Sequence, residues 1–513
     1  MRHESYLHDA ERQWGWRSMK AIGKCDLMLL ACGLAVFLVH CISVGYYPMC
    51  WNDEVEIIEI GRRALFPNED WSVYLSAMPG GGYALPFPLF HYVAAAIQEL
   101  LCRISGGFVL PRLFFLASLP ACAFALYKWL SLKKDIPSSC SLFVALLFLV
   151  DPNATICAHW YRPDLWAMTL LFISLILVAK RRFALAGAIS AFMVFFWITA
   201  ALFLPLILLE ALQHSESKWR DFLRATAGAV IAVAIVMIPL YSRLPEIVSQ
   251  YADHSELGCA SARSFTWVKA VDYVKIAVRS PAVWLLAVIG MACGKGRLAY
   301  AAIFCGLTVF MLWSRVYHLR MVYLMPYLFL FAAVAVAKMD GMLRKLVQGA
   351  SIAAYIMVSV VVLEVAAVPI GDNVLPNLMS RLKAAVPSGA SKVYLVDNEH
   401  ELYLACRKLG WKMYSSWTSA SAFDERFVGE LLREMDAVLV VDSSRFRPSA
   451  VEDAYLKRHG FVHTTSVRFN RSASGLRKLL VDFFYTYGYP DVIVYTKGCS
   501  DLKVTASEVH SPE

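Results

Sequence analysis

Charged residues are scarce in this sequence. Asp, Glu, Lys and Arg make up only 17% of its 513 residues, whereas hydrophobic residues make up 58% and the mean hydropathy is +0.53. A soluble globular protein needs more polar residues than this to cover its surface. Many of the apolar runs are also long enough to cross a bilayer. The composition therefore excludes a soluble protein and predicts an integral membrane protein with several spans.

Three common sequence patterns are also absent. None of the 13 cysteines lies in a CxxC pair, so they indicate neither a zinc site nor a disulfide framework, and a single bridge between Cys406 and Cys499 is the alternative. The polar C-terminal region holds no glycine-rich phosphate-binding loop, and no internal repeat runs through the chain.

The net charge of +9 comes from Lys and Arg residues that lie mainly in short clusters between the apolar runs. Clusters of this kind orient membrane spans towards the cytoplasm. We therefore interpret the charge as a signal of topology and expect the lipid bilayer, and no nucleic acid, as a partner.

The first apolar segment runs from about Asp26 to Tyr46, after a basic stretch. It is longer than the core of a signal peptide and lacks a small-x-small cleavage site, so we expect a retained anchor that follows a cytoplasmic tail of residues 1–25. Further apolar runs of spanning length lie at about 108–127, 138–158, 163–179, 184–213, 225–242, 281–294, 298–314, 319–337 and 346–369. Run 184–213 is long enough for two short passes.

The apolar run at 84–102 is ambiguous. Its prolines and the polar residues His91, Gln98 and Glu99 suit a helix at the interface better than one that crosses hydrocarbon. With this run outside the bilayer, every short cytoplasmic loop is basic. We therefore predict about 11 spans, with the N-terminus in the cytoplasm and the C-terminus outside. The alternative, in which 84–102 spans the membrane, stays open.

This topology divides the chain into two main parts. Residues 26–370 form a transmembrane domain with long outer loops at 48–107 and 243–280, and residues 371–513 form a soluble extracytoplasmic α/β domain. In the second part, we predict strands at 392–396, 437–441 and 492–495 and helices at 400–409, 423–435 and 450–458. Strands that alternate with helices indicate a small α/β sheet.

Three carboxylates on the predicted outer face are candidate catalytic residues. Asp53 and Glu54 follow the first span, and Asp164 lies in the turn Arg162-Pro163-Asp164. A positioned carboxylate can take the proton of an attacking hydroxyl. Each has a structural alternative, since carboxylates also complement a helix dipole or cap a first turn.

Cations on the same face are candidates for stabilising a phosphate leaving group. They are Arg162, His318, Arg320 and Arg112. The alternative for each is a side chain that reaches from the end of a span to the lipid headgroups.

The order of these motifs resembles the GT-C glycosyltransferases. The resemblance rests on an N-terminal span, Asp53-Glu54 at the start of a large outer loop, the Pro-x-Pro-Leu-aromatic segment at 86–90, Arg112-Leu113 at the next span and the Arg-x-Asp turn at 162–164. It covers about residues 26–340. The branch it resembles contains the protein O-mannosyltransferases and the bacterial lipid A aminoarabinose and galacturonic acid transferases.

The resemblance implies a membrane glycosyltransferase, in the bacterial inner (plasma) membrane, that takes a sugar from a polyprenyl-phosphate donor. Transfer would be inverting, to a lipid, glycan or protein hydroxyl on the outer face, with Asp53 as base beside Glu54 and Asp164 as the second acid. Residues placed to contact the sugar or the acceptor are Trp51, His91, Trp160, Tyr161 and Lys269. The sequence lacks the family's usual Pro-Pro pair and its preceding Lys, so Arg162, His318 and Arg320 are the substitutes.

Two other function classes fit a polytopic membrane protein. A transporter or flippase of lipid-linked glycans usually shows internal symmetry and polar groups at mid-membrane depth, and neither is evident here. A polysaccharide polymerase or ligase would use the same lipid-linked donors. No cofactor is required by the predicted reaction and no metal ligands are assigned. The pair Asp53-Glu54 could instead hold a divalent cation, and the sequence leaves metal dependence open.

Overall fold

The computed structural model describes most of the chain. The described residues are 23–41, 58, 61–62, 65–66, 68–69, 72–75, 88–159, 162–243, 267–294, 297–313, 322–366, 374–396, 400–416, 425–442, 450–467 and 491–497.

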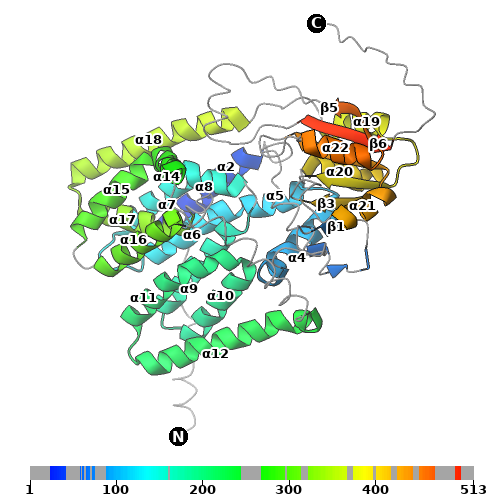
Figure 1. The fold of residues 1–513 in the computed structure, drawn as a ribbon. Coiled ribbons are helices and arrows are strands. Elements are labelled where there is room, and N and C mark those ends of the chain that lie inside the picture. The colour runs from blue at the N-terminus through cyan, green and yellow to red at the C-terminus, as the bar shows by residue number, and fades with distance from the viewer. Residues whose placement is uncertain are drawn as a thin grey trace.

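The N-terminal part of the chain forms a helical domain (Figure 1). Its helices are α2 (Lys24–Cys41), α4 (Pro88–Ser105), α5 (Val109–Leu116), α6 (Ser118–Leu130), α7 (Ser138–Leu149), α8 (Pro152–His159), α9 (Asp164–Ala179), α10 (Phe183–Phe196), η1 (Ile198–Phe203), α11 (Leu204–His214), α12 (Lys218–Met237), η2 (Ile238–Arg243), α14 (Trp267–Arg279), α15 (Pro281–Cys293), α16 (Leu298–Trp313), α17 (Met325–Lys338) and α18 (Gly341–Ala366). Every segment predicted to span the membrane contains helix, and the break between α10 and η1 divides run 184–213 as expected.

Among the described residues, two helical stretches are long and apolar enough to cross a membrane by themselves. They are Lys24–Cys41 and Val109–Leu130, and the pair α7 and α8, bent by 51°, would be a third. The other apolar helices have 10–17 residues. The count of 11 spans therefore stays a prediction.

Proline and aspartate set several helix starts. Proline occupies the first turn of α11, α15 and α17, where no backbone N–H is needed. At the bend between α7 and α8, the Oδ1 atom of Asp151 accepts hydrogen bonds of 3.0 Å from the backbone N–H groups of Asn153 and Ala154. Asp151 therefore caps α8, and the chain turns at this point.

Glycines allow several helices to pack at very short distances. A side chain at Gly187 of α10 would overlap the carbonyl of Ala225 in α12, and one at Gly228 of α12 would overlap the carbonyl of Ala184 in α10. Gly290 of α15 lies in the same way against Phe331 of α17. Small residues at the contact are typical of helix pairs in membranes, where close approach increases van der Waals packing.

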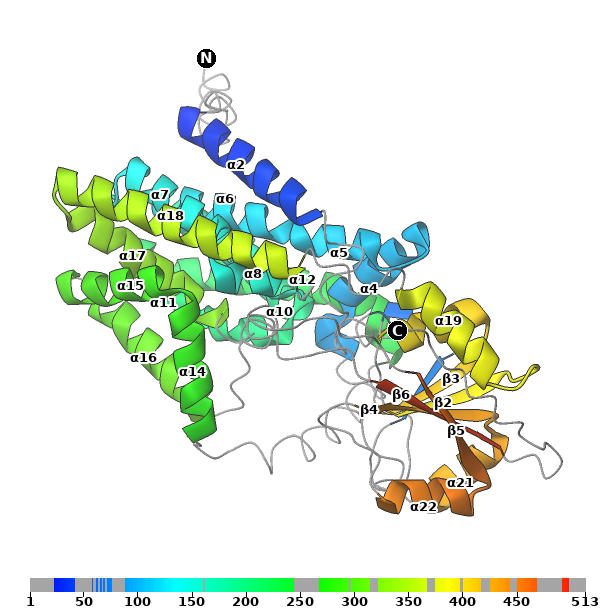
Figure 2. The same ribbon diagram turned by 90° about the horizontal axis from the view of Figure 1, so that it is seen from above.

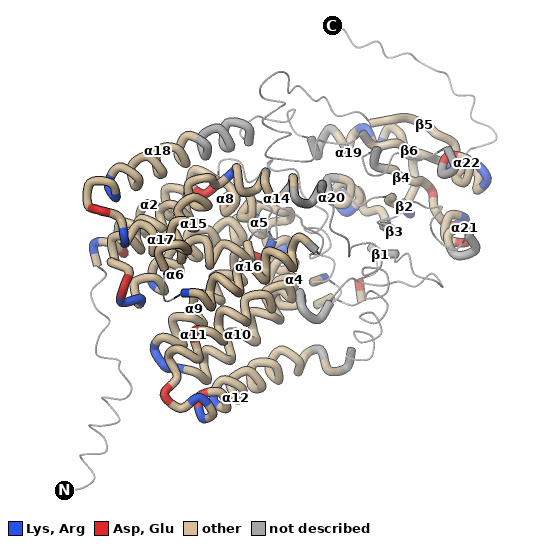
Figure 3. The backbone as a smooth tube through the Cα atoms, turned by 60° about the vertical axis from the view of Figure 1, so that its left-hand side comes forward, with Lys and Arg blue, Asp and Glu red and all other residues tan. Residues whose placement is uncertain are grey.

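The outward faces of the helical domain are apolar. On α12, for example, Val230 and Ile231 are each 61% exposed and Ile235 is 64% exposed. Charged residues gather near helix ends and on the C-terminal domain, and most of the helical body is uncharged (Figure 3). Exposed apolar side chains of this kind are suited to contact with lipid tails.

The C-terminal part of the chain forms a six-stranded sheet in the order β1-β3-β2-β4-β6-β5. The strands are β1 (Ser72–Leu75), β2 (Lys392–Val396), β3 (Lys412–Ser416), β4 (Ala437–Asp442), β5 (Phe461–Val467) and β6 (Asp491–Lys497). Strands β1, β3, β2 and β4 are parallel, and β6 is antiparallel to both β4 and β5. The sheet thus takes one strand from the connection between α2 and α4.

Helices cover both faces of this sheet (Figure 2). Leu395 and Leu439 face α19 (Val374–Ala385) and α20 (His400–Leu409), in a core that also contains Ile58 and Phe108. The opposite face packs on α21 (Glu425–Glu434) and α22 (Ala450–Arg458). The α19 and α20 face is turned towards the helical domain.

The predicted elements of this domain agree closely with the structure. The strand at 392–396 and the helices at 400–409 and 450–458 coincide with β2, α20 and α22. Strands β3 and β5 were not predicted, because more than half of the residues in Lys412–Ser416 and Phe461–Val467 are polar, and neither segment forms the apolar run that indicates a buried strand. Strand β1 was not predicted either, since its pairing partner β3 lies far along the chain.

Candidate functional site

A buried carboxylate forms the centre of the candidate site. Asp164 is the first residue of α9, and its side chain is only 4% exposed. Its Oδ1 atom accepts hydrogen bonds from Trp197 Nε1 at 2.9 Å and from the Tyr323 hydroxyl at 2.7 Å. Its Oδ2 atom accepts a hydrogen bond from Arg162 Nε at 3.0 Å. Three donors, one of them a guanidinium, therefore surround the carboxylate.

Helix ends bring these groups together. Trp197 lies in extended conformation, with φ −155° and ψ 114°, at the break between α10 and η1. Tyr323 lies two residues before α17, and its hydroxyl is also hydrogen-bonded to the hydroxyl of Thr199 in η1. The starts of α9, η1 and α17 thus meet at Asp164.

Asp164 and Trp197 together fix the orientation of Arg162. The side chain of Arg162 is 17% exposed, and its guanidinium lies 5.0 Å from the centre of the Trp197 ring. An ion pair in such surroundings is stable only when the geometry is good and the remaining hydrogen bonds are made. Asp164 and Trp197 supply that geometry, so that Arg162 is a fixed cation at the end of the helical bundle.

A second polar cluster lies beside the first. His159, the last residue of α8, and His40, in the last turn of α2, are 1% and 3% exposed. Nε2 of His159 lies 2.8 Å from Nδ1 of His40, so that one ring donates and the other accepts. Arg112, which is 4% exposed, lies in α5, a helix that contacts α8.

Helix α8 joins the two clusters. It ends at His159 and contacts both α5, which contains Arg112, and α9, which begins at Asp164. Ionisable residues buried in a membrane domain are costly, and they commonly mark a binding or catalytic site. The two clusters together therefore define one candidate site, at the point where α2, α5, α8, α9 and α17 end or begin.

The side chain of Asn153 joins two helices and is not a glycosylation site. It lies in the sequence Asn-Ala-Thr, which fits the pattern for N-glycosylation. Its amide nitrogen is buried and donates to Ser280 Oγ at 2.6 Å and to the carbonyl of Ile276 at 3.0 Å. These bonds tie α8 to the end of α14.

The structure tests the position of only some residues that the sequence predicts for the site. It brings Arg162 and Asp164 into direct contact and places Arg112 in α5, a helix that contacts α8. His91 and Lys269 lie in α4 and α14, but their side chains are not among the described atoms. The other predicted residues lie outside the described residues: Trp51, Asp53, Glu54, Trp160, Tyr161, His318 and Arg320.

Sequence reasoning missed four residues of the candidate site: His40, His159, Trp197 and Tyr323. Each lies at the end of an apolar helix, and the two histidines are ionisable residues inside apolar runs, which is the signal that could have identified them. Trp197 and Tyr323 carry no such signal, because aromatic residues are common at the ends of spans. Within the described part of the chain, no group of three or more His, Cys, Asp or Glu side chains could hold a metal ion.

Comparison with known proteins gives matches only at the level of structure. No family model matches the sequence, and no curated protein sequence matches it. Solved structures of membrane glycosyltransferases do match, over most of the chain.

One of these structures is ArnT from Cupriavidus metallidurans. Its apo form is 16% identical to this chain, with 91% of this chain and 97% of ArnT covered and a TM-score of 0.59. ArnT bound to undecaprenyl phosphate is 14% identical, with 92% of this chain and 98% of ArnT covered and a TM-score of 0.58.

Two further proteins have similar structures. Arabinofuranosyltransferase AftD from mycobacteria is 15% identical, with 93% of this chain and 40% of AftD covered and a TM-score of 0.56. The oligosaccharyltransferase AglB from Archaeoglobus fulgidus, in complex with an inhibitory peptide and a dolichol-phosphate, is 12% identical, with 83% of this chain and 71% of AglB covered and a TM-score of 0.50.

These similarities confirm the fold that the order of motifs predicted. ArnT, AftD and AglB are GT-C glycosyltransferases, and the chain has the GT-C fold. The exposed apolar faces of the helices, together with this fold, identify the chain as an integral membrane protein.

Proposed function

We propose that this protein transfers a sugar from a polyprenyl-phosphate donor to a hydroxyl group of an acceptor on the outer face of the membrane. The observation that carries the proposal is the Arg162-Asp164 ion pair at one end of a GT-C fold, in which the buried Asp164 carboxylate also accepts hydrogen bonds from Trp197 and Tyr323. Two proteins of this fold have been solved with a polyprenyl-type phosphate bound, ArnT with undecaprenyl phosphate and AglB with a dolichol-phosphate.

The reaction needs a base and a cation. The acceptor oxygen attacks the anomeric carbon, the bond from that carbon to the phosphate oxygen breaks, and the phosphate leaves with the electron pair. The proton of the acceptor hydroxyl passes to the base, for which we propose Asp53 with Glu54 as its neighbour. A phosphate leaving group needs no proton, but its growing charge must be stabilised by cations.

Arg162 and Arg112 are our proposed phosphate-binding residues within the described part of the chain. Arg162 is fixed by Asp164, and Arg112 is buried in α5, which contacts α8, the helix that ends at His159. A guanidinium held in advance costs little reorganisation when the charge develops on the phosphate. His318 and Arg320 complete the proposal for the phosphate. Trp51, His91, Trp160, Tyr161 and Lys269 remain the proposed contacts of sugar or acceptor.

The geometry changes the role that we assign to Asp164. From the sequence it was a candidate catalytic acid beside Asp53. Since its carboxylate accepts hydrogen bonds from Arg162, Trp197 and Tyr323, we now propose that it positions Arg162 and takes no part in proton transfer. A transporter or flippase is not favoured, because the proteins that share the fold are transferases.

The proposal can be tested with the full-length protein in lipid nanodiscs. A panel of undecaprenyl phosphates that carry radiolabelled pentoses and hexoses would be offered together with a membrane extract as acceptor, and labelled product would be counted. We expect transfer from at least one donor, and loss of at least a hundredfold in Asp53→Asn. Asp453→Asn, on the surface helix α22, is the matched control and should keep full activity.

Two results would contradict the proposal. An Asp53→Asn variant that inserts and keeps full activity would remove Asp53 as the base. If no lipid-linked donor gave labelled product and the protein bound a soluble nucleotide sugar instead, polyprenyl phosphates would be excluded as the donor class.

A further inference from the structure

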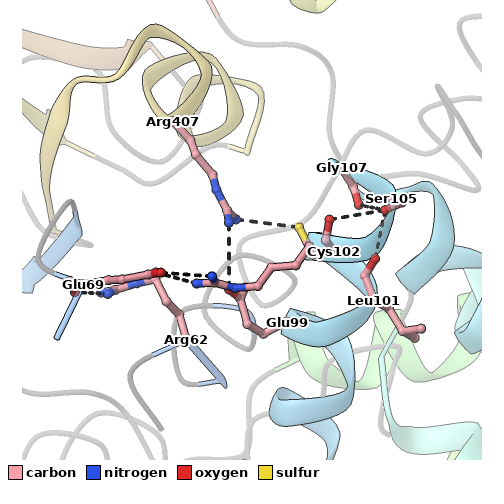
Figure 4. Close-up of polar contacts among 9 residues, drawn as sticks. Arg62, Glu69, Glu99, Leu101, Cys102, Ser105, Gly107 and Arg407 are labelled. Carbon is pink, nitrogen blue, oxygen red and sulfur yellow. Dashed lines mark hydrogen bonds and ion pairs between the residues drawn. The ribbon is translucent and has the colours of Figure 1, made fainter. Parts of the chain in front are cut away.

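An ionic cluster joins three distant parts of the chain (Figure 4). Arg103 of α4 donates to both carboxylate oxygens of Glu69, with a distance of 3.0 Å from Nη1 to Oε1. Nε of Arg103 donates to Oε1 of Glu99 at 2.5 Å. Nη2 of Arg407, in α20 of the C-terminal domain, lies 3.8 Å from the same Glu99 oxygen. The cluster therefore links the α2–α4 connection (residues 42–87), helix α4 and the C-terminal domain.

Burial makes the members of this cluster depend on one another. The side chain of Glu99 is 0% exposed, whereas those of Arg103 and Arg407 are 28% and 25% exposed. A buried carboxylate is costly unless cations and hydrogen-bond donors surround it. Arg103 lies in α4 and binds Glu69, so it holds the α2–α4 connection against this helix. Arg407 lies in α20 and reaches Glu99, so it holds the C-terminal domain against the same helix.

The α2–α4 connection is fixed to α4 by further contacts. Arg62 is 1% exposed and donates to the carbonyl of Glu69. The Arg103 guanidinium lies 3.5 Å from the centre of the Phe66 ring, a favourable arrangement of a cation on an aromatic face. Gly61 lies so close to the carbonyl of Ala95 that no side chain could be accommodated there.

The same connection is fixed to the C-terminal domain. Ile58 is fully buried in the core that includes Leu395, Leu439 and Cys406. Residues Ser72–Leu75 form strand β1, which pairs in parallel with β3 from Ser72 opposite Met413 to Leu75 opposite Ser416. The connection therefore supplies both a core residue and an edge strand to a domain that begins some three hundred residues later in the chain.

We infer that Arg103 and Arg407 are positioning residues, which hold the α2–α4 connection between α4 and the C-terminal sheet and thereby set the geometry of the transfer site. The inference rests on the proposed function, because this connection is the segment that contains Asp53 and Glu54. The C-terminal domain is then part of the catalytic framework, in addition to any role in choosing the acceptor. A displacement of about 1 Å in a reacting group can lower a rate by about a hundredfold, so that a modest loosening is measurable.

The first experiment measures the position of the connection without any use of activity. Cysteines introduced at Tyr74 and Ser415, which are partners in the β1 and β3 register, would be oxidised to a disulfide in the full-length protein, and the linked peptide would be quantified by mass spectrometry. We expect Arg407→Gln to slow the crosslinking at least threefold. Lys408→Gln, an exposed neighbour on the same helix, should leave the rate unchanged. Variants that carry only one of the two introduced cysteines control for disulfides formed with the native cysteines.

The second experiment measures transfer. We expect Arg407→Gln to lower kcat about tenfold with little change in the KM for the donor, and Arg407→Lys to recover part of the loss. Formation of the Tyr74→Cys to Ser415→Cys disulfide in the Arg407→Gln protein should restore most of kcat, and its reduction should remove the gain again. A purely structural loss of folded protein would not be restored in this way.

The outcomes separate the inference from the proposed function. The inference would be overturned if the crosslinking rate were unchanged in both Arg407→Gln and Arg103→Gln, or if the disulfide did not restore kcat in Arg407→Gln. Sugar transfer by the wild-type protein would still support the proposed function in either case. A wild-type protein that transfers no sugar from any lipid donor would instead overturn the function. The crosslinking rate would still decide whether these arginines hold the connection.

Discussion

The hydroxyl of Tyr323 donates a hydrogen bond of 2.7 Å to the carboxylate of Asp164, although 159 positions separate the two residues. Tyr323 precedes α17 and Asp164 begins α9, so the bond forms only where the ends of these helices meet. Trp197 donates to the same oxygen from the break before η1. Three chain segments therefore converge on one carboxylate, which in turn holds Arg162.

Removal of the Tyr323 hydroxyl should weaken this arrangement without unfolding the protein. A hydrogen bond to a charged group contributes about 1.5–3 kcal/mol, so we expect Tyr323→Phe to lower kcat/KM by about 10- to 100-fold. Kinetic assay of sugar transfer measures the effect. Tyr241→Phe is the control, because Tyr241 is 78% exposed. Equal activity of the two variants would show that the Tyr323 hydroxyl does not support the site.

Substitution of Arg162 should separate charge from geometry. Lysine keeps the charge but has no guanidinium. It therefore cannot donate from Nε to Asp164 and present further N–H groups of the same plane to a phosphate. We expect Arg162→Lys to weaken the binding of undecaprenyl phosphate about tenfold and Arg162→Gln to weaken it more, as measured by native mass spectrometry. Arg220→Gln, at a residue whose side chain is 60% exposed, provides the control. Wild-type affinity in Arg162→Gln would exclude this residue from the phosphate site.

Close packing of α10 on α12 should make Gly228 sensitive to a single methyl group. The Cβ atom of Gly228→Ala would overlap the backbone of Ala184, and overpacking of this kind costs about 1–3 kcal/mol. We expect a lower thermal unfolding temperature in detergent. Gly306→Ala is the matched change, since nothing lies within 4 Å of its added carbon. If both variants unfold at the same temperature, α10 and α12 do not pack as closely as the structure shows.

The ion pair between Glu69 and Arg103 should make stability depend on pH in acid. The hydrogen bond from Arg103 lowers the pKa of Glu69 below its ordinary value of 4.5. A carboxyl group whose pKa is lower in the folded state stabilises that state above its ordinary pKa, and the contribution is lost as the pH falls through the folded value. We therefore expect wild type to be more stable than Glu69→Gln at pH 7, with a difference that shrinks below about pH 4.5.

Thermal unfolding of both proteins between pH 7 and pH 3.5 measures this difference. Glu430→Gln, at an exposed position of α21, controls for the loss of one negative charge. A difference between wild type and Glu69→Gln that stays constant across this range would mean that the ion pair with Arg103 does not contribute.

The sequence predicted many local features correctly. Run 184–213 was predicted to be long enough for two short passes, and its helix breaks at Trp197. The strand at 392–396 and the helix at 400–409 were placed correctly, because a buried β-branched run and an amphipathic run are encoded by neighbouring residues. Arg162 and Asp164 were predicted to lie in one turn at the start of an apolar helix, and they form an ion pair.

What the sequence by itself determined is the class of protein and the local elements, because apolar length, periodicity and turn residues act over a few neighbouring positions. Only the tertiary structure decided which helix ends meet, and with that the pairing of His40 with His159 and of Tyr323 with Asp164. It also decided that Ser72–Leu75 belongs to the C-terminal sheet. Contacts between residues that are far apart in the sequence depend on how whole helices and strands pack, and the local patterns of a single sequence do not specify that packing.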